Sequence, residues 1–558
     1  MKRTLTVLIP FLLLSFSMTG CEGEDPTQCS YWVKRLSNPS KAREALQQVG
    51  MMKCVEAGDT LKTMFDEGRN RTEVLAAAQS FDDKTVVVDL LKKALRIKDI
   101  SKNAANMIAD MKLVEAKPIL EQVLTSGRNA EVRGPGLKAL LSMTENKADI
   151  EGILLKILAA DPAIQGAEAT KLAAESLGEI RSEKAIPDLI KLLFAGTTDP
   201  SLISIYRSVR ASLAAIGTPA AKPVADALNG SYQPLNDYIQ MKQIPTWKWQ
   251  WGPRLVEVLG DLRDEAGAAP IAEKVLARDS YGIWAGLSDE QRDEGNPTYE
   301  KLRGDWNKEV SKGFLMSALS LGRIGSDNGV EKLASIIPNQ PRRDWSQRTN
   351  AALALSLIGT DKAVNALIDA FEKEELSEGK ANLLGFLSMA IGPTQLKRGW
   401  GPIEKELADR AKRISRKKPI TQFQAYLDAK LKEPGAGDRI RAHVKVVQDC
   451  EENTGCYINK LKNSQDVFTK EKAAMVLWRG ERNTEVFQAL FDSFKNMDPR
   501  KERDQRLFLL AGMGRVGTKE DAKRVNAHID ELSQQKRVDP QWLAELRSLR
   551  AFLSLLSA

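Results

Sequence analysis

Residues 169–193 read ATKLAAESLGEIRSEKAIPDLIKLL, and this stretch decides the fold. Apolar residues from Ala169 to Ile180 recur at steps of three and four, so they share one face of a helix. After a short polar break, apolar residues from Ile186 to Leu193 mark a second amphipathic helix. Pro187 falls in the first turn of that helix, where its missing N–H leaves no carbonyl without a partner. One such unit cannot bury both apolar faces alone, so the stretch predicts a stack of similar helix pairs.

The same pattern returns along the chain. Positions equivalent to Ile180, the last apolar residue of a first helix, recur about 35 residues apart through much of the sequence. These positions are Val49, Met111, Met143, Ile216, Leu262, Ile324, Ile358 and Val516. A glycine directly follows five of them, which favours helix ends that adopt a positive φ. These glycines are Gly50, Gly217, Gly325, Gly359 and Gly517. A proline recurs seven residues after the equivalent position at Pro118, Pro187 and Pro223, so a first-turn proline is expected in three second helices.

The order of these features is apolar residues, then I-G-T or I-G-S, then A-x-x-x-L-I. It resembles HEAT repeats of the short kind known as PBS-lyase HEAT-like. The resemblance covers most of residues 29–395 and again roughly 440–530. It implies an all-α chain, an α-solenoid of about a dozen short helix pairs. Tetratricopeptide repeats have a similar period, but their tryptophan, Leu-Gly and tyrosine signature is missing here. Such a resemblance indicates the fold, but it says very little about the function.

The composition restricts the function classes. Of the 558 residues, 42% are hydrophobic and 28% are charged, as is ordinary for a helical protein. The formal charge is +8; without residues 1–20, which hold two lysine or arginine residues and no acid, it is 80 − 74, or +6. This mild, interspersed charge argues against a nucleic-acid partner. Two histidines in all, His443 and His528, argue against a metal site, and no motif calls for a cofactor.

Residues 1–20 predict an export signal rather than part of the fold. A positive start precedes an apolar run over residues 5–16, too short to span a membrane. The sequence MTGC at 18–21 then resembles the lipobox of bacterial lipoproteins, with Met18 in place of the usual leucine. The resemblance implies cleavage before Cys21 and lipid attachment to it. The alternative is an ordinary signal peptide in which Cys21 has no role.

The same resemblance implies where in the cell the protein is located. Glu22 follows the cysteine instead of the aspartate associated with inner-membrane retention, so we expect an outer-membrane lipoprotein that faces the periplasm. Several acyl chains on Cys21 would anchor the chain stably. Residues 22–28 form a polar tether that reaches at most about 25 Å, so the array is expected to begin close to the bilayer.

Four further cysteines are expected to pair locally. Cys29, Cys54, Cys450 and Cys456 allow three pairings. In a solenoid, stacked helices lie about 8–10 Å apart, so the first and last cysteines would lie too far apart to bond. This leaves Cys29–Cys54 and Cys450–Cys456, in keeping with an oxidising periplasm. Free buried thiols, or half of a metal site at the second pair, are the alternatives.

The repeat spacing stretches in the middle of the chain, at about 229–250 and 280–308. Six of the ten tryptophans lie in the hundred-residue stretch that holds these two insertions, and insertions in repeat arrays often project from the binding face. Clustered aromatic rings suit a protein interface or stacking on sugar rings; the alternative is a small local core that holds the loops down. The candidate binding residues are Trp247, Trp249, Trp251, Trp284 and Trp306.

After residue 395 the pattern weakens, and a smaller helical block is expected at the end. A basic run over Arg410–Lys418 indicates a solvated helix end or a contact with anionic lipid or an acidic envelope polymer. The final helix, about 540–556, is expected to cap the array. The predicted segments are 1–20 signal peptide, 21–28 lipidated tether, 29–395 repeat array, 396–437 degenerate helical linker region and 438–558 C-terminal helical block.

No nucleophile-and-base pattern, zinc motif or phosphate-binding loop stands out in the sequence. We therefore expect a non-enzymatic, lipid-anchored scaffold that holds an envelope protein on its curved face. A carbohydrate- or peptidoglycan-binding protein that uses the tryptophan insertion is the alternative. An enzyme is the third hypothesis, because some relatives of these repeats act as chromophore lyases, but the two histidines and the lack of a visible site argue against it.

Overall fold

The computed structural model shows a helical chain made of two compact units, residues 1–143 and 144–558. The structure describes residues 25–126, 131–198, 202–244, 252–277, 297–338, 345–375, 377–396, 398–403, 405, 436–498, 503–535 and 538–556. All regular elements in these ranges are helices, as the repeat pattern predicts.

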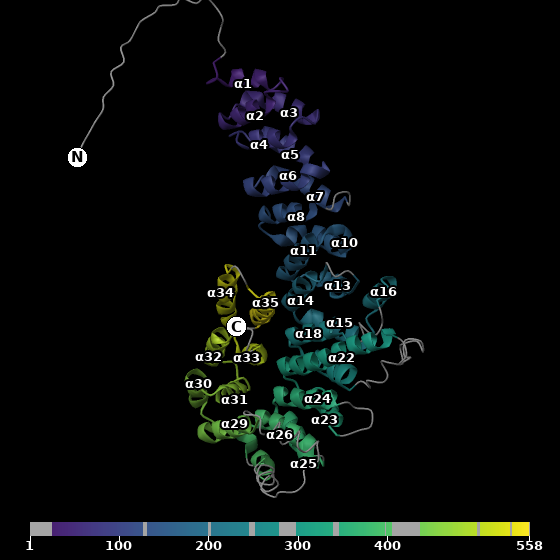
Figure 1. Cartoon of the computed structure of the whole chain (residues 1–558), viewed down its shortest axis with the longest axis vertical. Coiled ribbons are helices and arrows are strands. Elements are labelled where there is room, and N and C mark those ends of the chain that lie inside the picture. The colour runs from purple at the N-terminus through teal and green to yellow at the C-terminus, as the bar shows by residue number, and fades with distance from the viewer. Residues whose placement is uncertain are drawn as a thin grey trace, which may run out of the picture. The chain divides into compact units, whose positions relative to one another are not determined.

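Unit 1 stacks short helices in chain order (Figure 1). Its helices are α1 (Cys29–Arg35), α2 (Ala42–Met51), α3 (Gly58–Asp66), α4 (Arg71–Gln79), α5 (Thr85–Ala94), α6 (Lys98–Met111), α7 (Lys117–Thr125) and α8 (Arg133–Ser142). The first helix of each pair packs on the first helix of the next, so that α2 contacts α4, α4 contacts α6 and α6 contacts α8. This nearest-neighbour stacking is the geometry of a solenoid.

The array continues in unit 2, and one series of its helices forms an inner row. This row consists of α11 (Ala167–Glu179), α14 (Ile205–Ile216), α18 (Pro253–Leu262), α22 (Pro297–Ile324), α24 (Trp345–Ile358) and α26 (Ser377–Ala390). Each helix of the row contacts the next one. The other row and its connections consist of α9 (Glu151–Ala159), α10 (Pro162–Gln165), α12 (Ile186–Leu192), α13 (Ala195–Thr198), α15 (Thr218–Asn229), α16 (Gln233–Met241), α19 (Ala268–Ile271), α23 (Val330–Ile336) and α25 (Asp361–Lys373).

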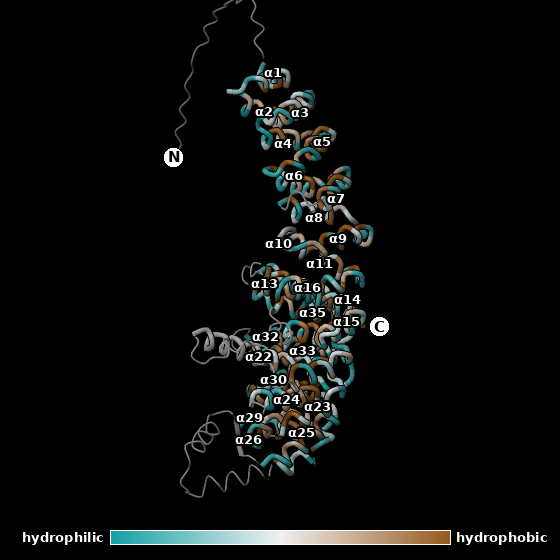
Figure 2. Tube along the Cα trace, turned by 90° about the vertical axis from the view of Figure 1, so that its right-hand side faces the viewer, coloured by the Kyte–Doolittle hydropathy of each residue, from teal (hydrophilic) through white to brown (hydrophobic). Residues whose placement is uncertain are grey.

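The quoted stretch folds as its periodicity predicts. Its first helix is α11, which ends at Glu179, and its second is α12, which has Pro187 in the first turn. Leu177 and Leu189 are fully buried between neighbouring pairs. Each buried leucine of this kind stabilises the fold by about 1.5–3 kcal/mol relative to an exposed one. Figure 2 shows the resulting alternation of apolar and polar residues along the helices.

The turn between paired helices differs from the expected glycine in several repeats. Gly217, Gly325 and Gly359 have positive φ, as predicted. Gly50 lies inside α2, and neither it nor Gly517 is among the positive-φ residues. Basic residues take the left-handed position in other repeats, namely Lys53, Lys112, Arg181 and Arg263. A short 3₁₀ turn follows each of these, for example η1 (Val55–Ala57), η2 (Val114–Ala116) and η4 (Glu183–Ala185).

The prediction of a first-turn proline holds for two of its three sites. Pro118 and Pro187 lie at the starts of α7 and α12. Pro223 lies inside α15, because that helix begins earlier, at Thr218, with Pro219 in its first turn. The second helix of this repeat is therefore longer than the sequence pattern indicates.

The C-terminal block does not continue the line of the array. It comprises α29 (Ala436–Cys450), α30 (Thr454–Asn463), α31 (Val467–Leu477), α32 (Thr484–Asn496), α33 (Arg503–Val516), α34 (Asp521–Ser533) and α35 (Pro540–Leu555). Within unit 2 this block turns back, so that α31 contacts α26, α33 contacts α22, and α35 contacts α14 and α18 (Figure 1). The expectation that the last helix caps the end of the array is therefore wrong: α35 packs against its middle.

Candidate functional site

The contact between the inner row and the C-terminal block, here called the seam, gathers most of the buried charge of unit 2. At its centre, Arg210 of α14 and Arg323 of α22 bond to two carboxylates. Arg210 Nη2 lies 2.9 Å from Asp261 Oδ1 and 3.2 Å from Glu545 Oε1. Arg323 completes the square, with 2.7 Å to Asp261 Oδ1 and 2.8 Å to Glu545 Oε2. All four residues are at most 6% exposed.

The charges of this square are mutually compensated. Burial alone would raise the pKa of Glu545, but the neighbouring Arg210 and Arg323 lower it to about 2. Glu545 is therefore ionised at any physiological pH. Removing one partner of such a buried group leaves an uncompensated charge, which costs about 3–5 kcal/mol. The square joins α35 to helices more than 200 residues earlier in the chain, so it holds the C-terminal block closed on the array.

Around the square, cations of the seam bond to main-chain carbonyls, in the middle of α33 and at the end of α26. Arg263 donates to Leu510 O and Ala511 O of α33, at 3.1 and 3.0 Å. Lys472 of α31 donates to Ser388 O and Met389 O at the end of α26, at 2.7 and 3.0 Å. The last carbonyls of a helix lack partners within the helix and carry partial negative charge, so a cation is favourable there.

The glycines that end the inner helices have a second role at the seam. A Cβ atom on Gly217 would lie 2.7 Å from Leu555 Cδ1, and one on Gly325 would lie 3.1 Å from Arg515 Cζ. At Gly359 it would overlap the guanidinium of Arg479. Each glycine therefore makes room for one side chain of the C-terminal block. Sequence reasoning assigned these glycines only to helix termination and missed their partners.

A buried polar group lies where the chain turns from the array into the block. Ser388 Oγ is 3.2 Å from His443 Nδ1, and His443 Nε2 is 3.2 Å from Glu471 Oε2. This serine–histidine–carboxylate order was not predicted from the sequence. Burial lowers the pKa of His443 to about 4, so the ring is neutral at pH 7. Ser388 and His443 are fully buried. In this closed arrangement the group cannot meet a substrate, and it ties α26, α29 and α31 together.

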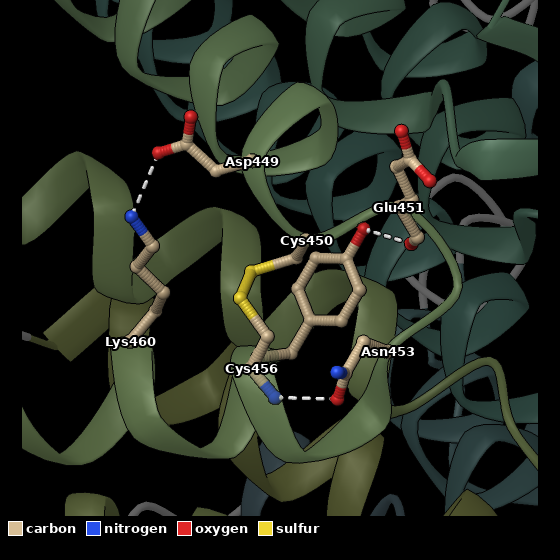
Figure 3. The surroundings of a disulfide bond; sticks show 7 residues. Asp449, Cys450, Glu451, Asn453, Cys456 and Lys460 are labelled. Carbon is tan, nitrogen blue, oxygen red and sulfur yellow. Dashed lines mark hydrogen bonds and ion pairs between the residues drawn. A yellow bond between two sulfur atoms is a disulfide. The ribbon is translucent and has the colours of Figure 1, made fainter.

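The structure contains both local cysteine pairs. Cys29 is bonded to Cys54, and Cys450 to Cys456, each with Cα atoms 5.4 Å apart. The second pair joins the end of α29 to the first turn of α30, where the side chain of Asn453 caps α30 by accepting from Cys456 N at 3.0 Å (Figure 3). This bond fixes the turn that borders one side of the seam.

The other predicted site residues are not described by the structure. Residues 1–24, with Cys21, lie outside the described residues. The same holds for Trp247, Trp249, Trp251 and Trp284, and for the basic run Arg410–Lys418. Trp306 lies on α22, but its side chain is not among those described. Within the described ranges no helix is long and apolar enough to span a membrane, and no cluster of ligand-type side chains suits a metal ion.

A sequence profile described as PBS lyase HEAT-like repeat matches residues 172–194, which correspond to most of α11 and to α12. The chain therefore contains a HEAT-like repeat at these residues. No protein with a curated description matches its sequence. Among solved structures, it is similar to the karyopherin Kap121p bound to the extreme C-terminus of the protein phosphatase Cdc14p, with 12% identity and a TM-score of 0.23. The match covers 95% of this chain but only 60% of the karyopherin chain.

Proposed function

We propose that this chain is a non-enzymatic scaffold that is anchored through lipid on Cys21 to the periplasmic face of a bacterial outer membrane and holds a protein partner. The HEAT-like repeats support the scaffold role, because stacked helix pairs present extended surfaces to other proteins. The lipobox-like MTGC at 18–21 supports the anchor. Two disulfides in the described ranges accord with an oxidising compartment.

One observation carries the choice of docking surface. In unit 2 the inner row from α14 to α26 is occupied by the chain's own C-terminal block, so this part of the curved face is already filled. We therefore assign the partner to unit 1. Its turns expose the apolar side chains of Met51, Val55 and Val114, with exposed fractions of 62, 53 and 60%. Val55 and Val114 occupy equivalent positions in two repeats, directly before the sequence Glu-Ala of η1 and η2.

Photocrosslinking in intact cells tests this assignment. A photoreactive residue replaces Val55 or Val114, and mass spectrometry identifies the adducts. Lys102, an exposed residue of α6, is the matched control position in the same unit. A defined protein adduct at Val55 and Val114, and none at Lys102, is the expected result. Adducts that are equal at all three positions, or none at all, would contradict a docking surface on these turns.

The alternative is carbohydrate binding beside the first insertion. The described part of that insertion forms α16, which packs on α12. Between them lies a cavity of about 450 Å³ lined by Tyr238, Lys242 and Asp161, among others. An aromatic ring next to hydrogen-bonding groups suits a sugar, and the predicted tryptophans follow directly in the sequence. A photoreactive residue at Trp249 that captures glycan instead of protein would favour this alternative over the scaffold.

A further inference from the structure

The seam contains an open polar cavity of about 680 Å³ that neither the scaffold role nor the closure of the block requires. Its walls on the array side are the starts of α25 and of the short turn η8 (Pro393–Gln395). The C-terminal block supplies the turn before α30, the end of α31, the start of α32 and one residue of α33. The volume is in the range of about 300–1,000 Å³ that is usual for sites of small ligands.

Three arginines line this cavity, and none of them has a carboxylate partner among the described residues. Arg479 bonds to Ser356 O and Met389 O, each at 3.1 Å. Arg515 bonds to Leu357 O and Ile358 O, each at 3.0 Å. Arg482 bonds to Gly514 O at 3.3 Å and to Gly517 O. Arg210 and Arg323, by contrast, are compensated by Asp261 and Glu545.

Several donor atoms of these arginines have no hydrogen-bond partner in the described structure. Arg479 Nε is buried and has no hydrogen-bond partner. Arg515 and Arg482 each use only Nη1 in their bonds to carbonyls, which leaves Nη2 and Nε of both without a partner in the described structure. A guanidinium offers its donors in a planar fork that matches the oxygens of a phosphate or carboxylate group.

Burial in this cavity wall makes the charged form of the arginines unfavourable. Burial lowers the pKa of Arg479 to about 9, with a further contribution from the charge of Arg515. Burial likewise lowers the pKa of Arg515 to about 10. Both shifts show that the surroundings disfavour the cations, and a bound anion would reverse that effect.

Three helices also begin at the cavity. Thr360, Asn453 and Asn483 cap α25, α30 and α32, and Thr360 and Asn483 are themselves lining residues. The N-terminal end of a helix carries the positive end of its dipole, so these three starts add to the field of the arginines.

Four carboxylates oppose this field at the rim, namely Asp361, Glu451, Glu452 and Glu481. All four side chains belong to exposed residues, where water and salt screen their charges. They would repel a polyanion that lay across the rim, while a small anion inside would face the less screened arginines. The arrangement therefore selects against nucleic acids and acidic polymers.

We propose that this cavity binds a small anion of the phosphate or carboxylate class through Arg479, Arg482 and Arg515. The anion would bridge the end of α31 to the starts of α25 and α32, and so would join the block to the array. This site is independent of the docking surface proposed on unit 1, and either assignment can fail without the other.

Isothermal titration of the full chain, purified in detergent, tests the site with inorganic phosphate and, separately, with succinate. Saturable binding of one probe is the expected result, and the stronger of the two identifies the group. R482Q should weaken that binding at least about tenfold, because it removes charge-assisted hydrogen bonds to the anion. E481Q should tighten it about twofold to fivefold by removing a rim charge. R441Q, at an exposed arginine of α29 that does not line the cavity, is the control and should change nothing.

Several outcomes would overturn the proposal. These are the absence of saturable binding of both probes, equal affinity of the wild type and R482Q, or a loss of binding in R441Q as large as in R482Q. Thermal melting of each variant checks the fold. If R482Q melts early, R482K retains the charge, and its affinity should lie between those of R482Q and the wild type. E481Q alters only an exposed side chain, so its tighter binding is a readout that misfolding could not produce.

Discussion

Arg323 of α22 donates to the carboxylate of Glu545 of α35 across 2.8 Å, although 222 residues separate the two in the sequence. Nearest-neighbour stacking alone would never bring them together. Their contact shows that unit 2 is an array closed by its own C-terminal helix.

Replacing Glu545 by Gln should destabilise unit 2 strongly. The change removes one negative charge from the square and leaves the two arginines with Asp261 and, for Arg210, the more distant Glu257. Breaking a buried pair of this kind costs about 3–5 kcal/mol, which urea unfolding would measure. E265Q, at an exposed position of the array with no bonded partner described, is the control and should cost less than about 0.5 kcal/mol. Equal unfolding midpoints for E545Q and E265Q would contradict the role of the square.

Gly359→Ala should destabilise the seam for two reasons. The φ of Gly359 is +65°, which L side chains rarely adopt, and the added Cβ would overlap the guanidinium of Arg479. We expect a loss of about 1–3 kcal/mol in thermal or urea unfolding. Gly385→Ala is the matched control, because Gly385 lies in α26 with no atom within 4 Å of its new Cβ. That control should be neutral or stabilising by up to about 1 kcal/mol, so the opposite order would refute the explanation.

Acid should weaken the turn into the C-terminal block through His443. Its pKa falls from 6.5 to about 4 on folding because burial disfavours the charged ring. The unfolded chain therefore binds the proton more readily between these values, and stability falls as the pH drops from 6.5 toward 4. The loss from this group is about 3 kcal/mol at full extent. Glu471, Lys472 and Arg439 are the charged groups that face the ring.

Urea unfolding at pH 7 and at pH 4.5 measures this effect. His443→Gln cannot gain a proton, so its difference in stability between the two pH values should be smaller than that of the wild type. His528→Gln, at the other histidine, whose Nδ1 lies 3.0 Å from Glu531 Oε2 on α34, is the control and should retain the wild-type difference. A pH difference that is the same in all three proteins would show that His443 does not carry the effect.

The two disulfides should contribute unequally. In the chain-entropy view, the bond Cys450–Cys456 closes six residues and contributes about 2 kcal/mol, while Cys29–Cys54 closes 25 residues and contributes about 3–4 kcal/mol. Non-reducing peptide mapping should recover these two linked pairs. Unfolding of C450S/C456S and of C29S/C54S then compares their contributions. A linked peptide that joins Cys29 or Cys54 to Cys450 or Cys456 would contradict the fold.

Cys21→Ser should release the chain from the membrane. If Cys21 carries the lipid, the variant loses incorporation of an alkyne-labelled fatty acid and appears in the soluble periplasmic fraction. Cys29→Ser, eight residues later, is a matched control that removes a cysteine but should retain the label. Labelling that persists in C21S would rule out lipid attachment at this residue.

The sequence predicted the repeat unit because apolar periodicity reports burial directly. Ile180 and Pro187 lie where the pattern placed them, and the local cysteine pairs followed from the stack. The seam was not predictable in the same way. Arg479 and Arg515 bond to main-chain carbonyls, and every residue has one, so the sequence does not indicate these partners. Glu545 is buried, but its residue type does not distinguish it from an exposed glutamate. The serine beside His443 comes from another helix, 55 residues earlier, so spacing gave no sign of it.

Closure by the last helix also constrains how the protein is made. Arg210 meets Glu545 across 335 residues, and α35 is the last helix of the described chain to leave the ribosome. Until then Arg210, Arg323 and Asp261 lack Glu545 as a partner, and Gly217 lacks its contact with Leu555. A chain made from its N-terminus would thus hold its middle repeats incomplete until α35 had been made. Truncation near the C-terminus would then destabilise α14, α18 and α22 in the middle of the array, although these helices lie far from the missing residues in the sequence.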